Sequence, residues 1–123
     1  MKVNSLVPII WTADLNRTID FYVNVIGFTC LANDSSKGWA RVKFDNAEII
    51  ISRPNNHVTF DKSVFTGTFY FNINNVDEIY SKVNQLAKLC YSIENFDYGM
   101  REFAIYDNNG YILQFGQDIV QGD

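Results

Sequence analysis

The stretch Tyr98-Gly-Met-Arg-Glu-Phe-Ala-Ile-Tyr-Asp-Asn-Asn-Gly-Tyr-Ile-Leu-Gln-Phe-Gly-Gln117 decides the fold, because it predicts a β-hairpin. Alternating side chains from Met100 to Tyr106 predict its first strand, and the apolar run from Tyr111 to Phe115 predicts its second. Between them, Asp107-Asn108-Asn109-Gly110 supplies short polar side chains and a glycine that accepts positive φ. These four residues therefore predict a tight turn.

The second strand of this hairpin carries a lone amide. Because successive side chains of a strand point to opposite faces, Gln114 shares a face with Ile112 and Gly116. On the first strand, Glu102 shares a face with Tyr106. We expect one amide on a face that is otherwise lined by small or apolar groups.

Length and cysteine content indicate a small intracellular domain. A chain of 123 residues fits one domain or two small halves that share a core. No secretory signal precedes Cys30 and Cys90, so we predict free thiols in a reducing cytoplasm. No stretch is long enough to cross a bilayer, and no membrane partner is predicted.

The charge is unevenly distributed and disfavours nucleic acid as a partner. The formal net charge is −4; residues 1–66 hold seven Lys or Arg against six Asp or Glu, and residues 67–123 hold three against eight. Nucleic-acid binding depends on Lys and Arg that neutralise phosphates. A cationic small molecule is easier to accommodate than an anionic one. An aromatic content of 15% supplies rigid apolar area for a core and for a ligand groove.

Read in order, the chain predicts the series strand, helix, strand, strand, strand twice. Asp14 and Asn75 are expected to cap the two helices, Gly27 to end the first, and Pro8 to mark an edge strand. The expected elements are strands at 3–11, 28–32, 38–44, 47–53, 68–74, 90–96, 100–106 and 111–115, and helices at 15–26 and 76–87.

The two halves are interpreted as copies of one unit. An offset of 61 pairs Asp14 with Asn75, and an offset of 62 pairs Asp45 with Asp107 and Ser52 with Gln114. We place module one at about 1–53, a connector at about 54–66 and module two at about 67–117.

Two motifs resemble the glyoxalase, bleomycin-resistance and extradiol-dioxygenase superfamily, also called the vicinal oxygen chelate proteins. Trp11-Thr-Ala-Asp-Leu-Asn-Arg-Thr-Ile-Asp-Phe-Tyr22 with Ile26-Gly-Phe28 is similar to that family's first strand and helix. Gly99-Met-Arg-Glu-Phe103 with Asp107-Asn-Asn-Gly-Tyr111 is similar to its final hairpin. The resemblance implies an α+β fold of two tandem βαβββ modules with cupped mixed sheets, and a homodimer that completes the cavities.

The resemblance also bears on metal binding. Metal-dependent members carry a histidine or similar ligand on the first strand of each half and a glutamate on the last. The corresponding residues are Val7, Ser52, Thr68 and Gln114, which offer a hydrocarbon, two neutral hydroxyls and an amide. His57, the single histidine, falls in the connector. We therefore predict no metal and no other cofactor.

The remaining branch is the metal-free one that includes bleomycin-resistance proteins, which sequester a flat, positively charged antibiotic. The hypothesis is therefore a cytoplasmic homodimeric binder of a small aromatic or cationic compound, such as a bleomycin-like antibiotic, rather than an enzyme. Such a ligand needs ring faces for stacking and carboxylates for its charge. The predicted ligand-binding residues are Trp11, Trp39, Tyr70, Tyr98, Glu102, Tyr106 and Gln114.

Two alternatives stay open from sequence. One is a metal-dependent lyase, isomerase or dioxygenase of the same superfamily, with ligands drawn from Glu48, Glu102 and His57. The other is a regulatory or interaction module that binds no ligand. The superfamily scaffold alone does not choose among these functions.

Overall fold

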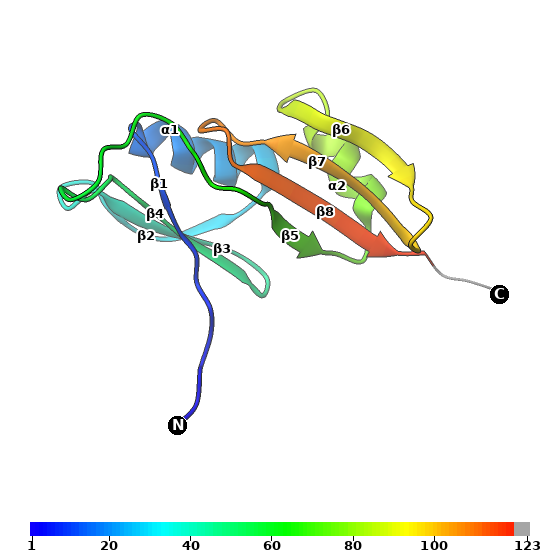
Figure 1. Cartoon of the computed structure of the whole chain (residues 1–123), viewed down its shortest axis with the longest axis horizontal. Coiled ribbons are helices and arrows are strands. Elements are labelled where there is room, and N and C mark those ends of the chain that lie inside the picture. The colour runs from blue at the N-terminus through cyan, green and yellow to red at the C-terminus, as the bar shows by residue number, and fades with distance from the viewer. Residues whose placement is uncertain (120–123) are drawn as a thin grey trace. The chain divides into compact units, whose positions relative to one another are not determined.

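A computed structural model of the chain describes residues 1–119, and contacts divide the chain into two compact units, Met1–Ser63 and Val64–Asp123. The first unit contains β1 (Ile9–Trp11), α1 (Leu15–Asp20), the π-helix η1 (Phe21–Ile26), β2 (Thr29–Asp34), β3 (Trp39–Phe44) and β4 (Ala47–Ser52) (Figure 1). The second contains β5 (Phe69–Asn72), α2 (Val76–Val83), β6 (Lys88–Asn95), β7 (Met100–Tyr106) and β8 (Ile112–Asp118). The predicted α+β class and repeated βαβββ order are confirmed.

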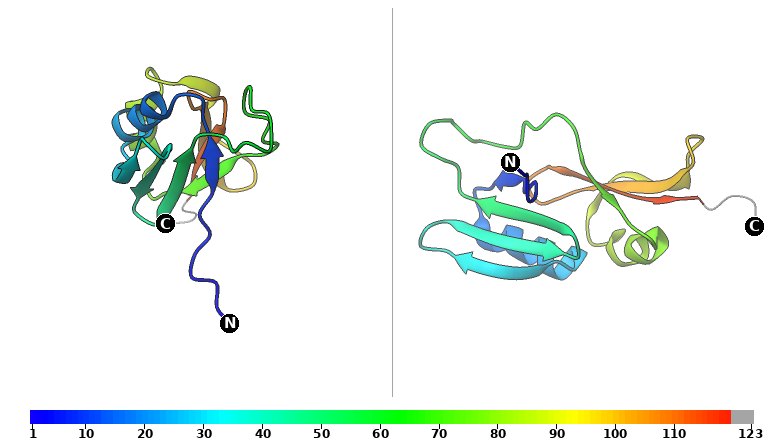
Figure 2. Two further views of the ribbon diagram at one scale, coloured as in Figure 1. Left: turned by 90° about the vertical axis from the view of Figure 1, so that its left-hand side faces the viewer. Right: turned by 90° about the horizontal axis from the view of Figure 1, so that it is seen from below.

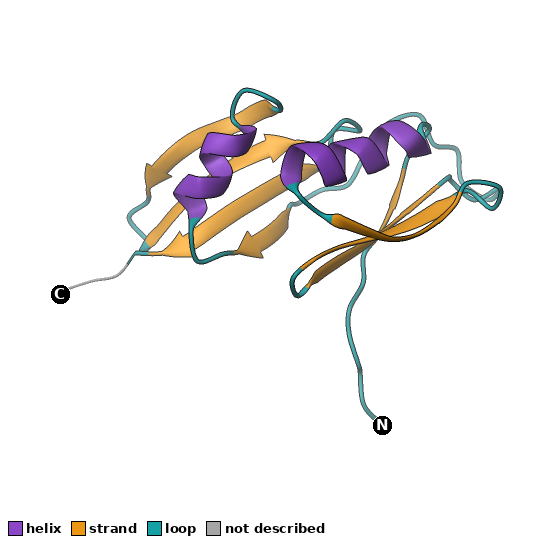
Figure 3. Ribbon diagram, turned by 180° about the vertical axis from the view of Figure 1, so that it is seen from behind, coloured by secondary structure: helices purple, strands orange, loops and turns teal. Residues whose placement is uncertain are grey.

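Each unit is one four-stranded mixed sheet with its helix packed on one face. The strand orders are β1-β4-β3-β2 and β5-β8-β7-β6, and the pairs β1–β4 and β5–β8 are parallel. Helix α1 contacts β3 and β4, and α2 contacts β7 and β8 (Figure 3). Figure 2 shows the strands of each sheet from two further directions.

Both predicted helix starts are present. The side chain of Asp14 accepts a hydrogen bond from Arg17 N–H at 3.1 Å, and that of Asn75 accepts one from Glu78 N–H at 3.2 Å. Each satisfies a backbone donor that the first helical turn leaves without an intrahelical partner.

The first helix differs from the prediction in its second half. From Phe21 it continues as a π-helix, and Gly27 N–H donates to the carbonyl of Tyr22, five residues earlier, at 3.1 Å. Gly27 ends the element at φ 114°, a left-handed conformation that glycine adopts without a Cβ clash.

The predicted strand at 3–11 forms only at Ile9–Trp11. Pro8 immediately precedes it and accepts a hydrogen bond from Ile50 N–H at 2.9 Å, but a proline has no N–H to return. β1 pairs with β4 alone and is an edge strand, as Pro8 predicts. No helix or strand lies between Ser52 and Phe69, and His57 is exposed there.

The predicted C-terminal hairpin is confirmed. Asp107 N–H donates to the Tyr111 carbonyl at 2.9 Å, and the Asp107 carboxylate accepts from the N–H groups of Asn109 and Tyr111 at 2.8 and 2.9 Å. Gly110 has φ 90°. The short polar side chain and the glycine thus hold the reversal, as their residue types predict.

The helix-facing side of the second sheet is an aromatic core. Phe103 and Phe115 are buried, and their stacked rings lie 5.2 Å apart between centroids. Tyr80 of α2 meets Phe103 edge-on at 4.9 Å. Because this face is filled, the opposite face of the sheet is the one left for a site.

Sheet register corrects the predicted alignment of the two halves. Buried Ile10 pairs with Ile51, and Ile51 with Ala40; in the second unit, Phe71 pairs with Phe115, and Phe115 with Phe103. The difference in residue number between equivalent positions of the two units is therefore 61 for β1 and β5, 63 for β3 and β7, and 64 for β4 and β8. The offset of 62 is wrong in the hairpin, and the counterpart of Gln114 is Ile50 rather than Ser52.

No helix within residues 1–119 combines the length and the apolar character that crossing a bilayer requires. Cys30 and Cys90 form no disulfide, as predicted.

Candidate functional site

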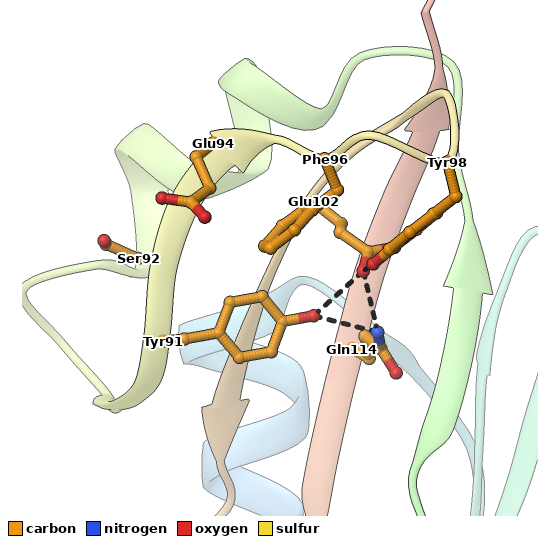
Figure 4. Close-up of a pocket in the computed structure, with 7 residues that line it drawn as sticks. All are labelled: Tyr91, Ser92, Glu94, Phe96, Tyr98, Glu102 and Gln114. Carbon is orange, nitrogen blue, oxygen red and sulfur yellow. Dashed lines mark hydrogen bonds between the residues drawn. The ribbon is translucent and has the colours of Figure 1, made fainter.

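A buried carboxylate is the centre of the second sheet's open face. Glu102, in the middle of β7, is only 2% exposed. Its Oε2 accepts a hydrogen bond from Tyr70 Oη at 2.9 Å. Its Oε1 accepts from Tyr91 Oη at 3.3 Å, from Gln114 Nε2 at 3.1 Å and from Tyr98 Oη. Figure 4 shows Tyr91, Tyr98 and Gln114 converging on this carboxylate.

The register of β5, β7 and β8 brings three of these groups together. Tyr70 pairs with Gln114, Gln114 with Ala104, and Glu102 with Gly116. A Cβ on Gly116 would lie 1.8 Å from Tyr70 Oη and 2.6 Å from its Cζ. The phenol of Tyr70 therefore reaches Glu102 through space that only a glycine leaves open.

Irregular backbone brings in the other two tyrosines. The pairing of β6 with β7 shifts register between Leu89 and Tyr91 and again between Tyr91 and Glu94. Such bulges bend a strand and redirect its side chains. After β6, Gly99 N–H donates to the Phe96 carbonyl at 3.2 Å, and this turn carries Tyr98 to the carboxylate.

Aromatic rings form the walls beside the carboxylate. Phe96 and Tyr98 are stacked with centroids 5.5 Å apart and planes 12° apart, whereas Tyr91 meets Phe96 at 5.7 Å and 89°. A pocket of about 370 Å³ opens here. It is lined by Tyr91, Ser92, Glu94, Phe96, Tyr98, Glu102 and Gln114 (Figure 4).

Burial and the Glu102 carboxylate raise the pKa of the surrounding phenols. Burial and then the negative charge of Glu102 raise the pKa of Tyr91 to about 12. The hydrogen bond to Glu102 is the main cause that raises the pKa of Tyr98 to about 12. Burial, followed by the same carboxylate, also raises the pKa of Tyr70. At neutral pH these phenols are therefore hydrogen-bond donors and not phenolate bases or ligands.

Four of the seven residues predicted from sequence come together in this cluster: Tyr70, Tyr98, Glu102 and Gln114. Tyr106 shares their strand face, but it lies at the end of β7, with Lys88 Nζ 5.3 Å from its ring centroid, and does not line the pocket. Trp11 and Trp39 belong to the first unit, where both pair with Ser52 in the sheet. The lining of the pocket does not include these three residues.

Sequence reasoning missed four pocket residues, namely Tyr91, Ser92, Glu94 and Phe96. Simple alternation along the strand could not assign their directions because β6 is bulged twice. The signal available in the sequence was composition: Tyr91, Glu94 and Phe96 lie within six consecutive residues of the predicted strand 90–96.

The residues at the predicted metal-ligand positions do not fit a divalent transition metal. Thr68 Oγ1 donates to Gln114 Oε1 at 2.9 Å, and Ser52 Oγ donates to the Arg53 carbonyl at 2.8 Å. Val7 has no ligand atom, and sheet register replaces Ser52 by Ile50, which has none either. Within the described residues, no three His, Cys, Asp or Glu side chains form a group that could hold a metal.

The architecture is a duplicated α+β fold of two βαβββ units, with an acidic and aromatic pocket on one sheet face of the second unit. The family model of the Glyoxalase/Bleomycin resistance protein/Dioxygenase superfamily matches residues 2–115. The chain therefore belongs to that superfamily, as its motifs predict. No curated protein sequence matches it.

Solved structures share the fold at low sequence identity. A protein of unknown function from Agrobacterium tumefaciens str. C58 aligns with a TM-score of 0.80 and 19% identity over 97% of each chain. TioX from Micromonospora sp. ML1 aligns with 0.79 and 18%, over 95% of this chain and 100% of TioX. Lactoylglutathione lyase from Agrobacterium tumefaciens aligns with 0.73 and 18%, over 95% of this chain and 96% of the lyase.

Gly116→Ala is expected to destabilise the protein by about 1–3 kcal/mol, because the new methyl overlaps the phenol of Tyr70. Urea unfolding of the wild type and the variant measures the loss. In a Tyr70→Ala background, the same substitution should cost much less, since the overlapping ring is absent. An equal cost in both backgrounds would contradict the assigned close approach.

Glu102→Gln is expected to lower the pKa of Tyr98 most of the way to its ordinary value near 10, and that of Tyr91 only in part. The carboxylate is the main cause of the first shift, whereas burial is the main cause of the second.

In the wild type, both folded-state pKa values lie above the unfolded value. The contribution of Tyr91 and Tyr98 to the free energy of unfolding is therefore complete below about pH 10 and is lost as the pH rises to about 12.

Assigned tyrosine carbon resonances followed by NMR against pH measure both pKa values. Glu78→Gln, which neutralises an exposed carboxylate at the start of α2, is the matched control and should leave both titrations unchanged. Equal decreases at Tyr98 and Tyr91 would overturn the assigned causes.

Proposed function

We propose that the protein binds and sequesters a small aromatic cation in the Glu102 pocket, without a metal and without changing the ligand chemically. The observation that supports this proposal is the buried carboxylate of Glu102, which is surrounded by aromatic rings and has no ion-pair partner within residues 1–119. A buried charge that lacks a protein counterion favours a ligand of opposite sign.

The lining of the pocket supports a cation rather than an anion. It contains two carboxylates, Glu94 and Glu102, and neither lysine nor arginine. At an effective dielectric constant of about 20, a unit cation about 5 Å from Glu102 gains roughly 3 kcal/mol of Coulomb energy. Tyr91, Phe96 and Tyr98 add ring area for stacking and for cation–π contact.

The size of the pocket suits one ring with one charged group. Pockets for small molecules hold roughly 300–1,000 Å³, and this pocket is near the lower end at about 370 Å³. A compact aromatic cation would fill it. A larger bleomycin-like antibiotic would insert only one charged aromatic group.

The polar groups support binding rather than catalysis. Glu102 is surrounded by donors, the neighbouring tyrosines are protonated, and Gln114 is hydrogen-bonded through both its oxygen and its nitrogen. A general base or a metal ligand needs a lone pair that faces the substrate or the ion. The arrangement is therefore suited to binding a ligand without changing it chemically.

Calorimetric titration with benzyltrimethylammonium and with bleomycin tests the proposal. At least one should bind with unchanged affinity after chelator treatment, and mass spectrometry should recover it intact. Glu102→Gln should weaken binding more than tenfold because the attracting charge is removed, whereas Glu78→Gln should not. Loss of binding on chelation, or turnover restored by a divalent metal, would favour the lyase, isomerase or dioxygenase alternative. Absence of binding by both compounds would favour a ligand-free module.

We further propose a cytoplasmic homodimer in which Trp11 and Trp39 also contribute to ligand binding. Both side chains are half-buried on β1 and β3 of the first unit, with their backbones paired to Ser52. Sedimentation of the full chain should give twice the 14.2 kDa chain mass. A monomer at all concentrations would overturn the dimer, and Trp11→Phe and Trp39→Phe variants with unchanged ligand affinity would overturn the role of the tryptophans.

A further inference from the structure

We infer that the Glu102 pocket selects cations that carry no N–H donors, such as quaternary ammonium groups, over primary ammonium groups of similar size. The inference rests on the proposed function and specifies the chemical class of its ligand. It depends on how the acceptors around the pocket are already used.

Four protein donors surround the carboxylate of Glu102, and three of them share Oε1. An ionised carboxylate offers about four lone-pair positions. Oε1 accepts from Tyr91, Tyr98 and Gln114, and Oε2 accepts from Tyr70. Because Oε1 is fully used and Glu102 is only 2% exposed, a bound cation is attracted by the charge of Glu102 without an accepting position for a direct hydrogen bond at Oε1.

Two neighbouring acceptors already take one protein donor each. Gln114 Oε1 accepts from Thr68 Oγ1 at 2.9 Å, and Tyr91 Oη accepts from Gln114 Nε2 at 2.8 Å. The other side-chain acceptors of the lining, on Ser92, Glu94 and Tyr98, belong to exposed residues. A primary ammonium group placed beside Glu102 would leave N–H groups unpaired there or displace a protein donor, and either cost is absent for a quaternary group.

The ring geometry supplies what a quaternary cation needs. Tyr91 and Phe96 are nearly perpendicular at 89°, and Tyr98 stacks on Phe96 (Figure 4). Ring faces attract cations through their quadrupole without forming hydrogen bonds, and aromatic clusters bind quaternary ammonium groups in this way. A quaternary cation would therefore be held by the charge of Glu102 and by cation–π contact with these rings, without a direct salt bridge.

Tyr98 is the donor that a primary ammonium would have to displace. It is 62% exposed and lies in the short connection between β6 and β7. Removal of its hydroxyl frees one acceptor position on Glu102 while the stacked ring stays. Tyr98→Phe should therefore change the preference between the two kinds of cation.

The test compares benzyltrimethylammonium with benzylammonium by calorimetry at neutral pH, because both carry one positive charge and the same ring. The wild type should bind the quaternary compound at least tenfold more tightly. In Tyr98→Phe, this ratio should fall at least threefold because the freed lone pair can accept from the primary ammonium. Tyr80→Phe, which removes a phenol from α2 on the opposite face of the sheet, should keep the wild-type ratio.

Each contrary outcome has a distinct meaning. Equal or tighter binding of benzylammonium by the wild type would overturn this inference and leave the proposed function standing. An unchanged ratio of the two affinities in Tyr98→Phe would show that the protein donors on the Glu102 carboxylate do not cause the selectivity. If neither compound binds and bleomycin does not bind either, the proposed function fails, and this inference fails with it.

Discussion

The second unit depends on the burial of one negative charge. Transfer of a carboxylate from water into a protein interior costs several kcal/mol unless hydrogen bonds replace its hydration. For Glu102 the donors come from β5, from β6, from the connection after β6 and from β8. The strands and the connection must therefore hold their register for the charge to stay buried. The same requirement that orders the sheet also orders the walls of the pocket.

Much of this arrangement follows from local sequence rules. Asp14 and Asn75 cap their helices because short polar side chains suit that position, and the Asp107 turn closes the hairpin for a similar reason. Alternation along two regular strands predicted which residues share a face with Glu102 and which with Gln114, and the pairing of β7 with β8 puts both on one face of the sheet. These predictions succeed where each depends on neighbours in the chain or on an unbroken strand.

The predictions fail where the register is irregular. Two bulges in β6 change the faces to which the side chains of Tyr91 and Glu94 point, so strict alternation along the strand does not predict them. The two halves also drift apart in numbering, because the loop around Gly110 is longer than the one around Asp45, and the offset of 62 therefore paired Ser52 with Gln114. Which side chains meet across a sheet depends on distant pairing, and hydrophobic patterns tolerate slips of two residues.

Corrected register also shows how the two copies have diverged. Where the second unit has Tyr70, Glu102, Gln114 and Gly116, the equivalent positions of the first are Ile9, Trp39, Ile50 and Ser52. Within residues 1–119, the same backbone therefore occurs twice, whereas the buried acidic centre occurs in the second unit alone. The first unit has no charge to solvate at these four positions, so substitutions there are expected to be limited by packing. Substitutions at equivalent positions of the two units are therefore expected to differ in cost, with packing lost in the first unit and a buried carboxylate left unsatisfied in the second.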